Sequence, residues 1–259
     1  MSYALSDQRC TRPPEYRLVR TGEGTDGLAG ILPPGLAAAE AFGDVAPDPL
    51  FSDESSVVST AVELRKLEFG RGRSCAHRAM VALGFAPEPV LAAVDRAPIW
   101  PAGIVGSISH CREYCCAVVG IADRWATIGV DAELLQPMEQ ELQERILSTK
   151  EQRWLEHLDP TIPWTCVVFS IKEAFYKAWS HLARGWLGFH DVLVRADPVS
   201  GRFEAELVRV PPPSCASLLR RIEGRFCFDG HNVLSAIAVP KPSIPRSFPS
   251  PDRRDNKTQ

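Results

Sequence analysis

The sequence predicts an α+β protein built from two halves, each of which combines one long helix with a few strands. A helical pattern between about residues 56 and 83 precedes three segments rich in valine and isoleucine, of which the first two lie in the first half. In the second half, a helical pattern over residues 164–183 precedes two pairs of strand-like segments. The halves divide near residue 126, so we expect an N-terminal half over 1–126 and a C-terminal half over 127–240.

Each element of the first half follows from local composition. Residues 1–54 are rich in glycine, proline and acidic residues, which favours loops, short strands and one short helix near Leu36–Phe42. In the helical pattern that follows, Gly70 and Gly72 each weaken the prediction by about 1 kcal/mol relative to alanine. The apolar residues expected in the core there are Val62, Leu64, Leu67, Phe69, Ala76, Ala79, Met80 and Leu83. The strands are expected at Ile104–Ser109, Cys115–Ile121 and Thr127–Glu133.

The second half contains clear start and turn signals. Ser148-Thr-Lys-Glu151 has the spacing of a capping box and predicts a short helix that ends near Leu158. Pro160 and Pro163 separate it from the longer helix Trp164–Ala183. Further strands are expected at Val192–Ala196, Phe203–Val210, Arg225–Phe228 and Val233–Val239, the last two joined by the hairpin signal Asp229-Gly230. The segment 241–259, rich in proline, serine and charge, is expected to be a disordered tail.

Composition narrows the class of protein. The 259 residues include 29 Lys+Arg and 32 Asp+Glu, a net charge of −3, so no global basic field is available for nonspecific nucleic-acid binding. An anionic ligand must therefore be held by a local cluster of cations. No stretch approaches the ~18 apolar residues of a membrane span. Because no secretory signal is visible and several of the eight cysteines lie in apolar runs, we expect a cytoplasmic protein with reduced thiols.

Two pairs of charged residues are the first candidates for chemistry. Asp131 and Glu133 alternate on a predicted strand, so their side chains share one face. Adjacent carboxylates repel each other and a hard cation such as Mg²⁺ would relieve this, although a solvated strand end shows the same pattern. Glu173 and Lys177 lie about 40° apart on a helix. Taken alone, that pair is more simply explained as a surface ion pair contributing about 0.3–0.5 kcal/mol.

Cations gather on the predicted helix of the first half. Residues 65–78 contain five arginines or lysines and one histidine, against the single acid Glu68. Arg65 and Arg73 are eight residues apart, which corresponds to about 80° around a helix. Planar guanidinium groups suit phosphate, although most charge runs simply form a solvated helix face.

The segment Trp100–His110 combines glycines, serines and a histidine. Its glycines would let the backbone approach a phosphate, and Ser109 and His110 would supply donors beside it. The segment lacks the G-x-S-x-G pattern of a serine hydrolase. His110 and the cysteines at 111, 115 and 116 superficially resemble a zinc site, but no second pair completes four ligands, so buried thiols are the better interpretation.

The order and spacing of these features resemble one family. Between Arg65 and Phe189 the chain contains R-x-x-E-F, G-R-x-C-A-x-R-A, R-x-P-x-W-P-x-G-x-x-G-S-I-S-H, I-G-V-D-A-E and F-S-I-K-E-A-F-Y-K-A-W. Together these motifs resemble the Sfp-type 4′-phosphopantetheinyl transferases, with the enterobactin synthase component D branch as the nearest match. The resemblance implies two pseudo-symmetric α/β halves with the active site in the cleft between them.

The resemblance also implies an activity. A 4′-phosphopantetheinyl transferase moves phosphopantetheine from coenzyme A to a serine of an acyl or peptidyl carrier protein, with Mg²⁺ or Mn²⁺, and releases adenosine 3′,5′-bisphosphate. The implied metal ligands are Asp131, Glu133 and Glu173. The implied catalytic residues are Glu173 as proton acceptor, Lys177 and Asp131. The implied coenzyme A contacts are Arg65, Arg73, Arg96, Ser109, His110 and Lys177. We expect a monomer that binds neither nucleic acid nor membrane.

Two alternatives stay open at this stage. One is a non-catalytic module that holds coenzyme A or a carrier protein, although the presence of all three acids and Lys177 argues against it. The other is a structural zinc protein built on His110 and the nearby cysteines. For the carrier-docking surface, Arg145, Arg153 and apolar residues between 137 and 165 are candidates, although an ordinary amphipathic helix explains them equally well.

Overall fold

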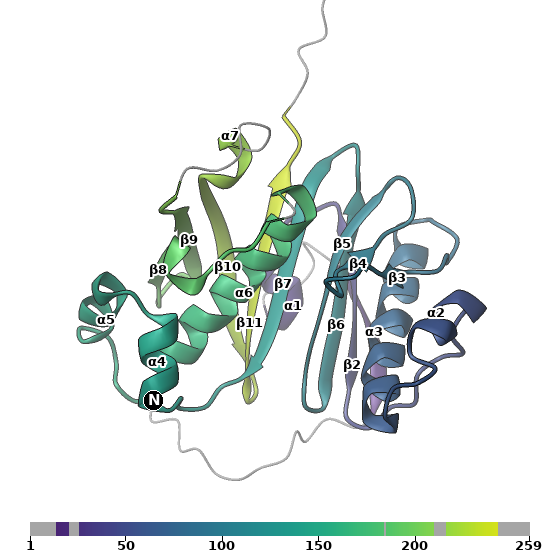
Figure 1. The fold of residues 1–259 in the computed structure, drawn as a ribbon, viewed down its shortest axis with the longest axis horizontal. Coiled ribbons are helices and arrows are strands. Elements are labelled where there is room, and N and C mark those ends of the chain that lie inside the picture. The colour runs from purple at the N-terminus through teal and green to yellow at the C-terminus, as the bar shows by residue number, and fades with distance from the viewer. Residues whose placement is uncertain (1–13, 21–25, 184, 210–215, 243–259) are drawn as a thin grey trace, which may run out of the picture.

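The computed structural model describes residues 14–20, 26–183, 185–209 and 216–242. Most of the strands form two large antiparallel sheets, and each of these is covered by one helix of 20 residues (Figure 1). The strand order is β1-β2-β6-β5 in the first sheet and β7-β11-β10-β9-β8 in the second. This architecture confirms the expected α+β class.

The first sheet contains β1 (Glu15–Arg20), β2 (Leu36–Phe42), β5 (Ile104–Cys111) and β6 (Tyr114–Ile121). The long helix α3 (Glu63–Ala82) packs on one face of it through small residues, among them Ala76 and Ala79. The remaining elements of this half are α1 (Gly27–Ile31), α2 (Ser52–Val57) and a small hairpin of β3 (Leu91–Ala92) and β4 (Pro98–Ile99).

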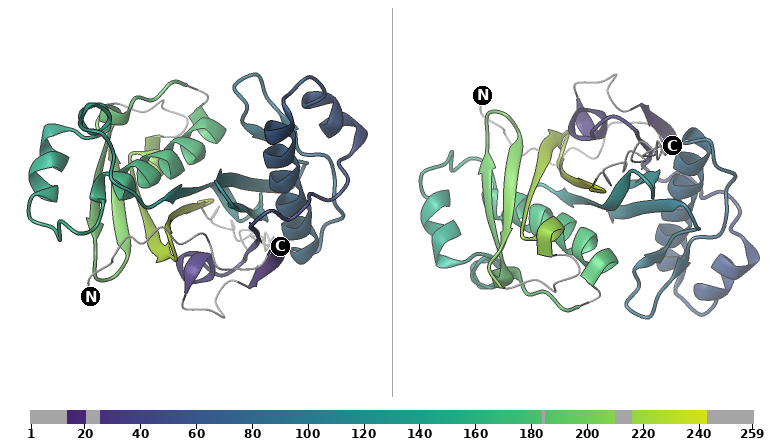
Figure 2. Two further views of the ribbon diagram at one scale, coloured as in Figure 1. Left: turned by 90° about the horizontal axis from the view of Figure 1, so that it is seen from below. Right: turned by 90° about the horizontal axis from the view of Figure 1, so that it is seen from above.

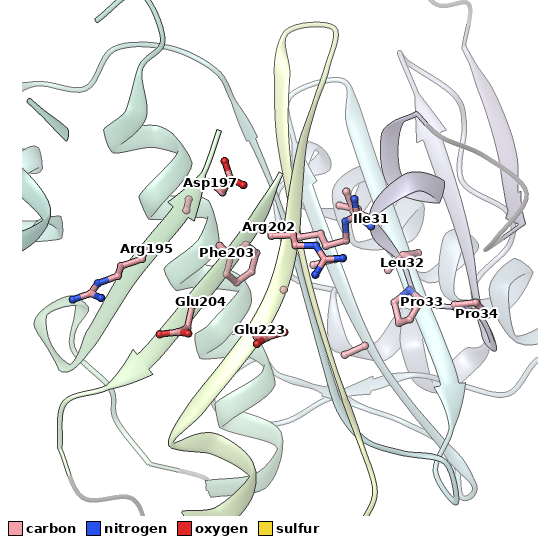
Figure 3. A pocket seen from close by; sticks show the side chains of 15 residues that line it. Ile31, Leu32, Pro33, Pro34, Arg195, Asp197, Arg202, Phe203, Glu204 and Glu223 are labelled. Atoms are coloured by element: carbon pink, nitrogen blue, oxygen red, sulfur yellow. The ribbon is translucent and has the colours of Figure 1, made fainter. Parts of the chain in front are cut away.

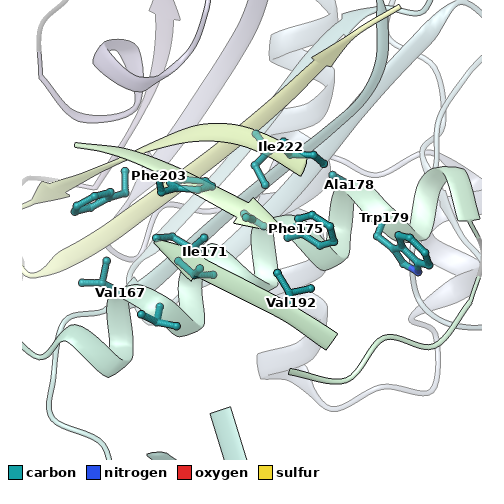
Figure 4. Packing of buried hydrophobic residues seen from close by; sticks show 14 of the residues in the cluster. Val167, Ile171, Phe175, Ala178, Trp179, Val192, Phe203 and Ile222 are labelled. Atoms are coloured by element: carbon teal, nitrogen blue, oxygen red, sulfur yellow. The ribbon is translucent and has the colours of Figure 1, made fainter. Parts of the chain in front are cut away.

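The second sheet contains β7 (Trp125–Leu134), β8 (Val192–Asp197), β9 (Arg202–Leu207), β10 (Arg221–Asp229) and β11 (Asn232–Pro240). Helix α6 (Trp164–Ala183) lies across one face and buries Ile171, Phe175 and Ala178 against the strands (Figure 4). Around it lie α4 (Gln140–Ile146), α5 (Thr149–Leu155), the 3₁₀ turn η1 (Phe189–Asp191) and α7 (Ala216–Leu219). The sequence prediction of α6 is confirmed at both ends.

The helix expected near Leu36–Phe42 is wrong, because this segment is the strand β2. Its alanines have a high intrinsic preference for helix. However, β2 pairs with β1 on one side and β6 on the other, and all seven of its residues are buried. Ala39 and Ala41 face α3, and Ala38 faces the opposite core. Small side chains allow a helix to approach the sheet closely, so tertiary pairing overrides the local preference.

The start of the first long helix also differs from expectation. The pattern placed three residues in the core that the structure exposes: Val62 is 74% exposed, Leu64 68% and Leu67 40%. The reason is that α3 buries only its section from Phe69 to Met80 against the sheet. The helical period therefore predicted the element but not how far the sheet extends beneath it.

The two sheets meet along a seam formed by β5 and β7, which lie side by side (Figures 1 and 2). At this seam, serine hydroxyls of β5 accept hydrogen bonds from backbone N–H groups of β7, as backbone carbonyls would in a continuous sheet. The Val130 N–H donates to Ser107 Oγ at 3.0 Å, and the Ala132 N–H donates to Ser109 Oγ at 3.1 Å. Both serines are buried. The predicted Ser109 is therefore part of the joint between the halves.

Helix α6 touches β7 directly at Gly129. A Cβ atom at this position would lie 1.9 Å from the Ala174 carbonyl oxygen, far inside van der Waals contact. Thr127 Oγ1 reinforces the approach by donating to the Ala178 carbonyl at 2.9 Å. The glycine in Ile-Gly-Val-Asp is thus required for the helix and strand to meet, and this contact brings Lys177 to Asp131.

Replacing Gly129 by alanine should destabilise the protein. The added methyl group must push α6 away from β7, and overpacking of this kind costs about 3 kcal/mol when the neighbour is backbone. Denaturant unfolding followed by circular dichroism measures the change. Gly188→Ala is the matched control, because its Cβ would meet only Asp191 Oδ2 at 3.6 Å, and its effect should stay within about 0.5 kcal/mol. Equal stability of the two variants would contradict the close approach.

Candidate active site

A hydrogen-bonded cluster at the seam joins residues from both halves. Lys177 Nζ on α6 donates to Asp131 Oδ1 at 2.7 Å, to Ser109 Oγ at 2.9 Å and to the Val130 carbonyl at 3.0 Å. Ser109 in turn donates to Asp131 Oδ1 at 3.0 Å. Burial opposes the charge of Lys177, but the Asp131 and Glu173 carboxylates outweigh it and raise the pKa of the lysine. The cluster therefore keeps a fixed ammonium group beside a buried carboxylate.

Asp131 has one oxygen without a partner. The residue is only 3% exposed, and its Oδ2 atom is buried without any hydrogen bond. Among the described residues, one other buried side-chain polar atom is unsatisfied, Nε1 of Trp100 on the neighbouring loop. A buried carboxylate oxygen without a donor is costly. Both unsatisfied atoms belong to residues around the seam, which marks this region as a ligand site.

The other two predicted metal ligands interact electrostatically with Asp131. Burial, together with the charges of Asp131 and Glu173, raises the pKa of Glu133 to about 7. Burial and the Asp131 charge also raise the pKa of Glu173. In the part of the chain that the structure describes, no three His, Cys, Asp or Glu side chains are close enough to enclose a metal ion. The unpaired Asp131 oxygen and the mutual repulsion of the carboxylates nevertheless fit a divalent cation.

A cavity of about 220 Å³ opens beside this cluster. Glu173 and Lys177 of α6 form one wall, and the turn of the β3–β4 hairpin with residues 106–108 of β5 forms the other. Arg96 lines it from the hairpin turn. The cavity thus lies between the two halves and brings together predicted residues that are about 80 positions apart in the chain.

Arg65 and His110 form a second, more exposed group. Arg65 Nη1 lies 3.4 Å from His110 Nε2, although the residues come from α3 and β5. Glu68 accepts a hydrogen bond from Arg65 at 3.2 Å and lies 3.9 Å from the imidazole. Burial is the main cause that lowers the pKa of His110, and Arg65 and Lys177 lower it further while Glu68 opposes them. The two predicted phosphate contacts are therefore adjacent and partly solvated.

Arg73 has different surroundings from Arg65. It is 6% exposed, and its guanidinium lies 4.0 Å from the centre of the Phe69 ring. Nε donates to the Val90 carbonyl at 2.5 Å and Nη2 to the Leu91 carbonyl at 3.3 Å. Burial lowers the pKa of Arg73 to about 10. The cationic stripe expected from the helix wheel is thus split between an exposed Arg65 and a buried Arg73.

Lys172, which precedes Glu173 on α6, is turned away from the cavity. Lys172 Nζ is buried and donates to Glu151 Oε2 and to the carbonyl of Ile146, both at 2.8 Å, and to the Phe189 carbonyl at 2.9 Å. Burial lowers the pKa of this lysine, and Glu151 opposes the shift. Lys172 therefore ties α6 to the α4–α5 region, while Glu173 beside it lines the cavity.

The cysteines do not assemble a zinc site in the described part of the chain. Six described cysteines are free, and Cys115 and Cys116 are buried on β6. Burial raises the pKa of Cys116 well above its usual value, which disfavours the thiolate that zinc requires. Two further cysteines, Cys10 and Cys215, lie outside the described residues. Four of the six described cysteines are buried, including Cys115 and Cys116, whereas Cys111 and Cys227 are half-buried.

A larger cavity of about 750 Å³ lies elsewhere, between the loop after α1 and the strands β8–β11 (Figure 3). Arginines and acids alternate on its sheet side, for example Arg202 and Glu204, and Pro33 and Pro34 form its other side. None of the predicted site residues lines it. We assign the chemistry to the smaller cavity, because it is lined by Glu173, whose pKa is raised, and by Lys177, which binds the buried Asp131.

The smaller cavity also includes residues to which the motifs assigned no role. Tyr176, Ser180 and His181 line it from α6, and Trp100 lines it from the opposite wall. Tyr176 and Ser180 lie three residues after Glu173 and Lys177, so helical periodicity could have placed them on the same arc. Helical periodicity could not have placed Trp100, since its position depends on how the loop after β4 folds back over Gly106.

The raised pKa of Glu133 predicts a pH dependence for the protein without divalent cations. The folded-state value of about 7 exceeds the ordinary 4.5, so the folded state binds an extra proton between them. The corresponding stability is complete below about pH 4.5 and is lost as the pH rises through about 7. In chelator-treated protein, Glu133→Gln should therefore flatten the fall in melting temperature between about pH 5 and pH 8. The same slope in both proteins would refute this assignment.

Comparison with known proteins identifies the family of this chain. Residues 53–120 match the 4′-phosphopantetheinyl transferase N-terminal domain, and residues 127–225 match the 4′-phosphopantetheinyl transferase superfamily. 4′-Phosphopantetheinyl transferase Svp of Streptomyces mobaraensis is 35% identical over 83% of this chain and 90% of its own length. 4′-Phosphopantetheinyl transferase Npt of Nocardia iowensis is 32% identical over 80% and 97%, respectively. Enterobactin synthase component D of Salmonella typhi is 32% identical over a shorter stretch, 51% and 56%.

The two family matches lie one in each half of the chain, and the similarity to Svp extends over 83% of it. The chain belongs to the 4′-phosphopantetheinyl transferase superfamily and is an enzyme of that class. Among the described helices, none is both long and apolar enough to span a membrane.

Proposed function

We propose that this enzyme transfers 4′-phosphopantetheine from coenzyme A to a serine of an apo acyl or peptidyl carrier protein and releases adenosine 3′,5′-bisphosphate. The observation that carries the proposal is the buried, unpaired Oδ2 of Asp131 beside the ammonium group of Lys177, next to a cavity between the two halves. A site with fixed positive charge and uncompensated carboxylates suits a pyrophosphate together with a cation.

In this proposal the two halves have separate tasks. Residues 1–126 would hold the nucleotide of coenzyme A, with Arg65 and His110 near its phosphates and Arg96 along the cavity. Residues 127–240 would supply the acids and the helix α6. Ser109 would orient Lys177 and Asp131, since its hydroxyl is bonded to both. Arg73 would act from its buried position beside the hairpin that carries Arg96.

Proton transfer is assigned to Glu173. Its pKa is raised by burial and by Asp131, so it is a better proton acceptor than an ordinary glutamate while remaining at the cavity wall. The carrier serine would give its hydroxyl proton to this carboxylate as its oxygen bonds to the β-phosphorus. The bond from that phosphorus to the bridging oxygen breaks, and the electron pair leaves with adenosine 3′,5′-bisphosphate. Lys177 offsets the charge that develops on the departing phosphate.

The proposed metal ligands are Asp131, Glu133 and Glu173. Mg²⁺ bound there would polarise the pyrophosphate and compensate its oxygens. Within the protein, Lys177 holds the Oδ1 atom of Asp131 and leaves Oδ2 available. We also propose a monomeric cytoplasmic enzyme, for which the free thiols of the described cysteines provide support.

Chromatographic detection of the nucleotide product tests this function. With coenzyme A, an apo carrier and Mg²⁺, adenosine 3′,5′-bisphosphate should form in step with modified carrier. EDTA should stop the reaction, and added Mg²⁺ in excess should restore it. A carrier whose acceptor serine is replaced by alanine should give no product. Nucleotide release that needs no carrier serine would instead indicate hydrolysis of coenzyme A and would overturn the proposed transfer.

A further inference from the structure

One wall of the cavity is formed by a hairpin with little support of its own. β3 and β4 are two residues each, and only two pairs join them. The connecting turn closes through the Ala93 N–H to the Ala97 carbonyl and the Arg96 N–H to the Ala93 carbonyl, both at 2.9 Å. Arg96 has a φ of 69°, a left-handed conformation that costs about 1 kcal/mol or more for a residue other than glycine. This geometry must therefore be maintained by contacts outside the hairpin.

Glu54 of α2 provides such a contact. Its side chain is fully buried. Oε1 accepts hydrogen bonds from the Val90 N–H at 2.8 Å and from His77 Nε2 at 2.9 Å, and Oε2 accepts from the Phe51 N–H at 3.1 Å. Burial raises the pKa of Glu54, but these hydrogen bonds outweigh it and lower the pKa overall. The buried Glu54 carboxylate thus binds the backbone N–H of Val90, the residue immediately before β3.

Arg73 binds the backbone carbonyl of the same residue, Val90. Its Nε donates to the Val90 carbonyl and its Nη2 to the Leu91 carbonyl. Both backbone polar groups of Val90 are therefore bound by charged side chains, one from α2 and one from α3. Since Leu91 begins β3, these bonds set where the hairpin leaves the body of the first half. Asp95, Arg96, Ala97 and Pro98 of that hairpin line the cavity.

We propose that Glu54 is a positioning residue that fixes the β3–β4 hairpin and thereby sets the affinity of the cleft for the nucleotide portion of coenzyme A. This inference rests on the proposed function, because it takes coenzyme A as the ligand. Glu54 does not line the cavity, so it acts through Val90 and the hairpin. The reacting groups lie on β7 and α6, which have no bond to Glu54 or Val90 among the described residues.

Glu54→Gln is the test. The amide keeps the shape of the side chain but replaces one acceptor oxygen by a donor that faces the N–H groups of its partners. We expect KM for coenzyme A to rise about tenfold, equivalent to ~1.4 kcal/mol, with kcat changed less than about twofold. Calorimetric titration with adenosine 3′,5′-bisphosphate should show the same loss of affinity, because that nucleotide does not enter the chemical step.

Glu40→Gln is the matched control. Glu40 is equally buried in the same half, and its carboxylate accepts from Arg17 and Tyr114 and not from the hairpin. It should lose stability without any change in KM or nucleotide affinity. If Glu54→Gln does not fold, Glu54→Asp, which keeps the charge but shortens the reach to Val90, should show the same loss of nucleotide affinity.

The outcomes separate this inference from the proposed function. Unchanged KM and nucleotide affinity in folded Glu54→Gln would overturn the positioning role. An equal loss of affinity in Glu40→Gln would overturn it too, because the effect would then reflect general loosening. If the wild type binds the nucleotide but transfers nothing to a carrier, the proposed function fails, and the calorimetric comparison still decides the role of Glu54.

Discussion

Asp131→Asn is expected to reduce transferase activity about a thousandfold while the protein remains folded. The change removes the charge that holds Lys177 Nζ at 2.7 Å and turns one of the two carboxylate oxygens into an amide. In either amide orientation, the site loses its buried anionic oxygen and with it one of the three proposed metal ligands. Steady-state transfer to an apo carrier measures the effect.

The control for this variant is Asp159→Asn. Asp159 lies in an exposed turn, where its carboxylate accepts from the N–H and the hydroxyl of Thr161. This variant should keep activity within about twofold, since surface substitutions away from special features change little. If folded Asp131→Asn retained more than about a tenth of wild-type activity, Asp131 would not be part of the reacting centre.

Lys172→Met is expected to cost about 3–5 kcal/mol of unfolding free energy. The substitution leaves Glu151 as an unpaired buried carboxylate and removes the donor for two buried carbonyls. The Glu151 carboxylate also accepts from the N–H of Ser148, the N-cap of α5, and from the Val194 N–H, both at 2.8 Å, so the loss reaches α5 and β8. Urea unfolding followed by fluorescence and circular dichroism measures it.

A double variant distinguishes this buried ion pair from simple packing. Lys172→Met combined with Glu151→Met removes both charges, so much of the lost stability should return. If the double variant is less stable by the sum of the two single effects, the charges do not interact as the structure indicates. Lys177→Met, on the same helix but at the cavity, should lower activity as well as stability, because it leaves the buried Asp131 without its ammonium partner.

The predicted helices and strands agreed best with the structure where the sequence contains a long apolar pattern. Helix α6 followed from its apolar arc, and β5 and β6 followed from their runs of apolar residues, which the structure buries on both faces of the sheet. Strand β2 could not be predicted in this way, since its alanines favour helix and only pairing with β1 and β6 makes it extended. The exposed Val62 and Leu64 show the same limit, because helical spacing does not reveal where the underlying sheet ends.

The site could be predicted in part. Spacing placed Asp131 beside Glu133 and Glu173 near Lys177, and the family resemblance suggested that these pairs belong to one site. Spacing did not reveal that Lys172 and Glu173, adjacent in sequence, point to different surroundings. It also placed Arg73 with Arg65, although one is buried against Phe69 and the other is exposed.

Contacts made by backbone atoms were invisible in the sequence. The bonds from Glu54 and Arg73 to Val90 depend on how the loop before β3 returns to α2 and α3. Likewise, the requirement for glycine at Gly129 appears only when α6 is laid on β7. Such contacts link residues far apart in sequence through main-chain groups, and residue type alone does not specify them.

The most direct test of the central claim is intact-mass spectrometry of an apo carrier protein incubated with this enzyme, coenzyme A and Mg²⁺. The cleft described here predicts that the carrier gains the mass of one phosphopantetheine group, and that a carrier lacking the acceptor serine gains none. Fatty-acid, polyketide and peptide-synthetase carriers should be tried in parallel. If the folded enzyme leaves all of them unmodified, transfer of phosphopantetheine at this site is contradicted.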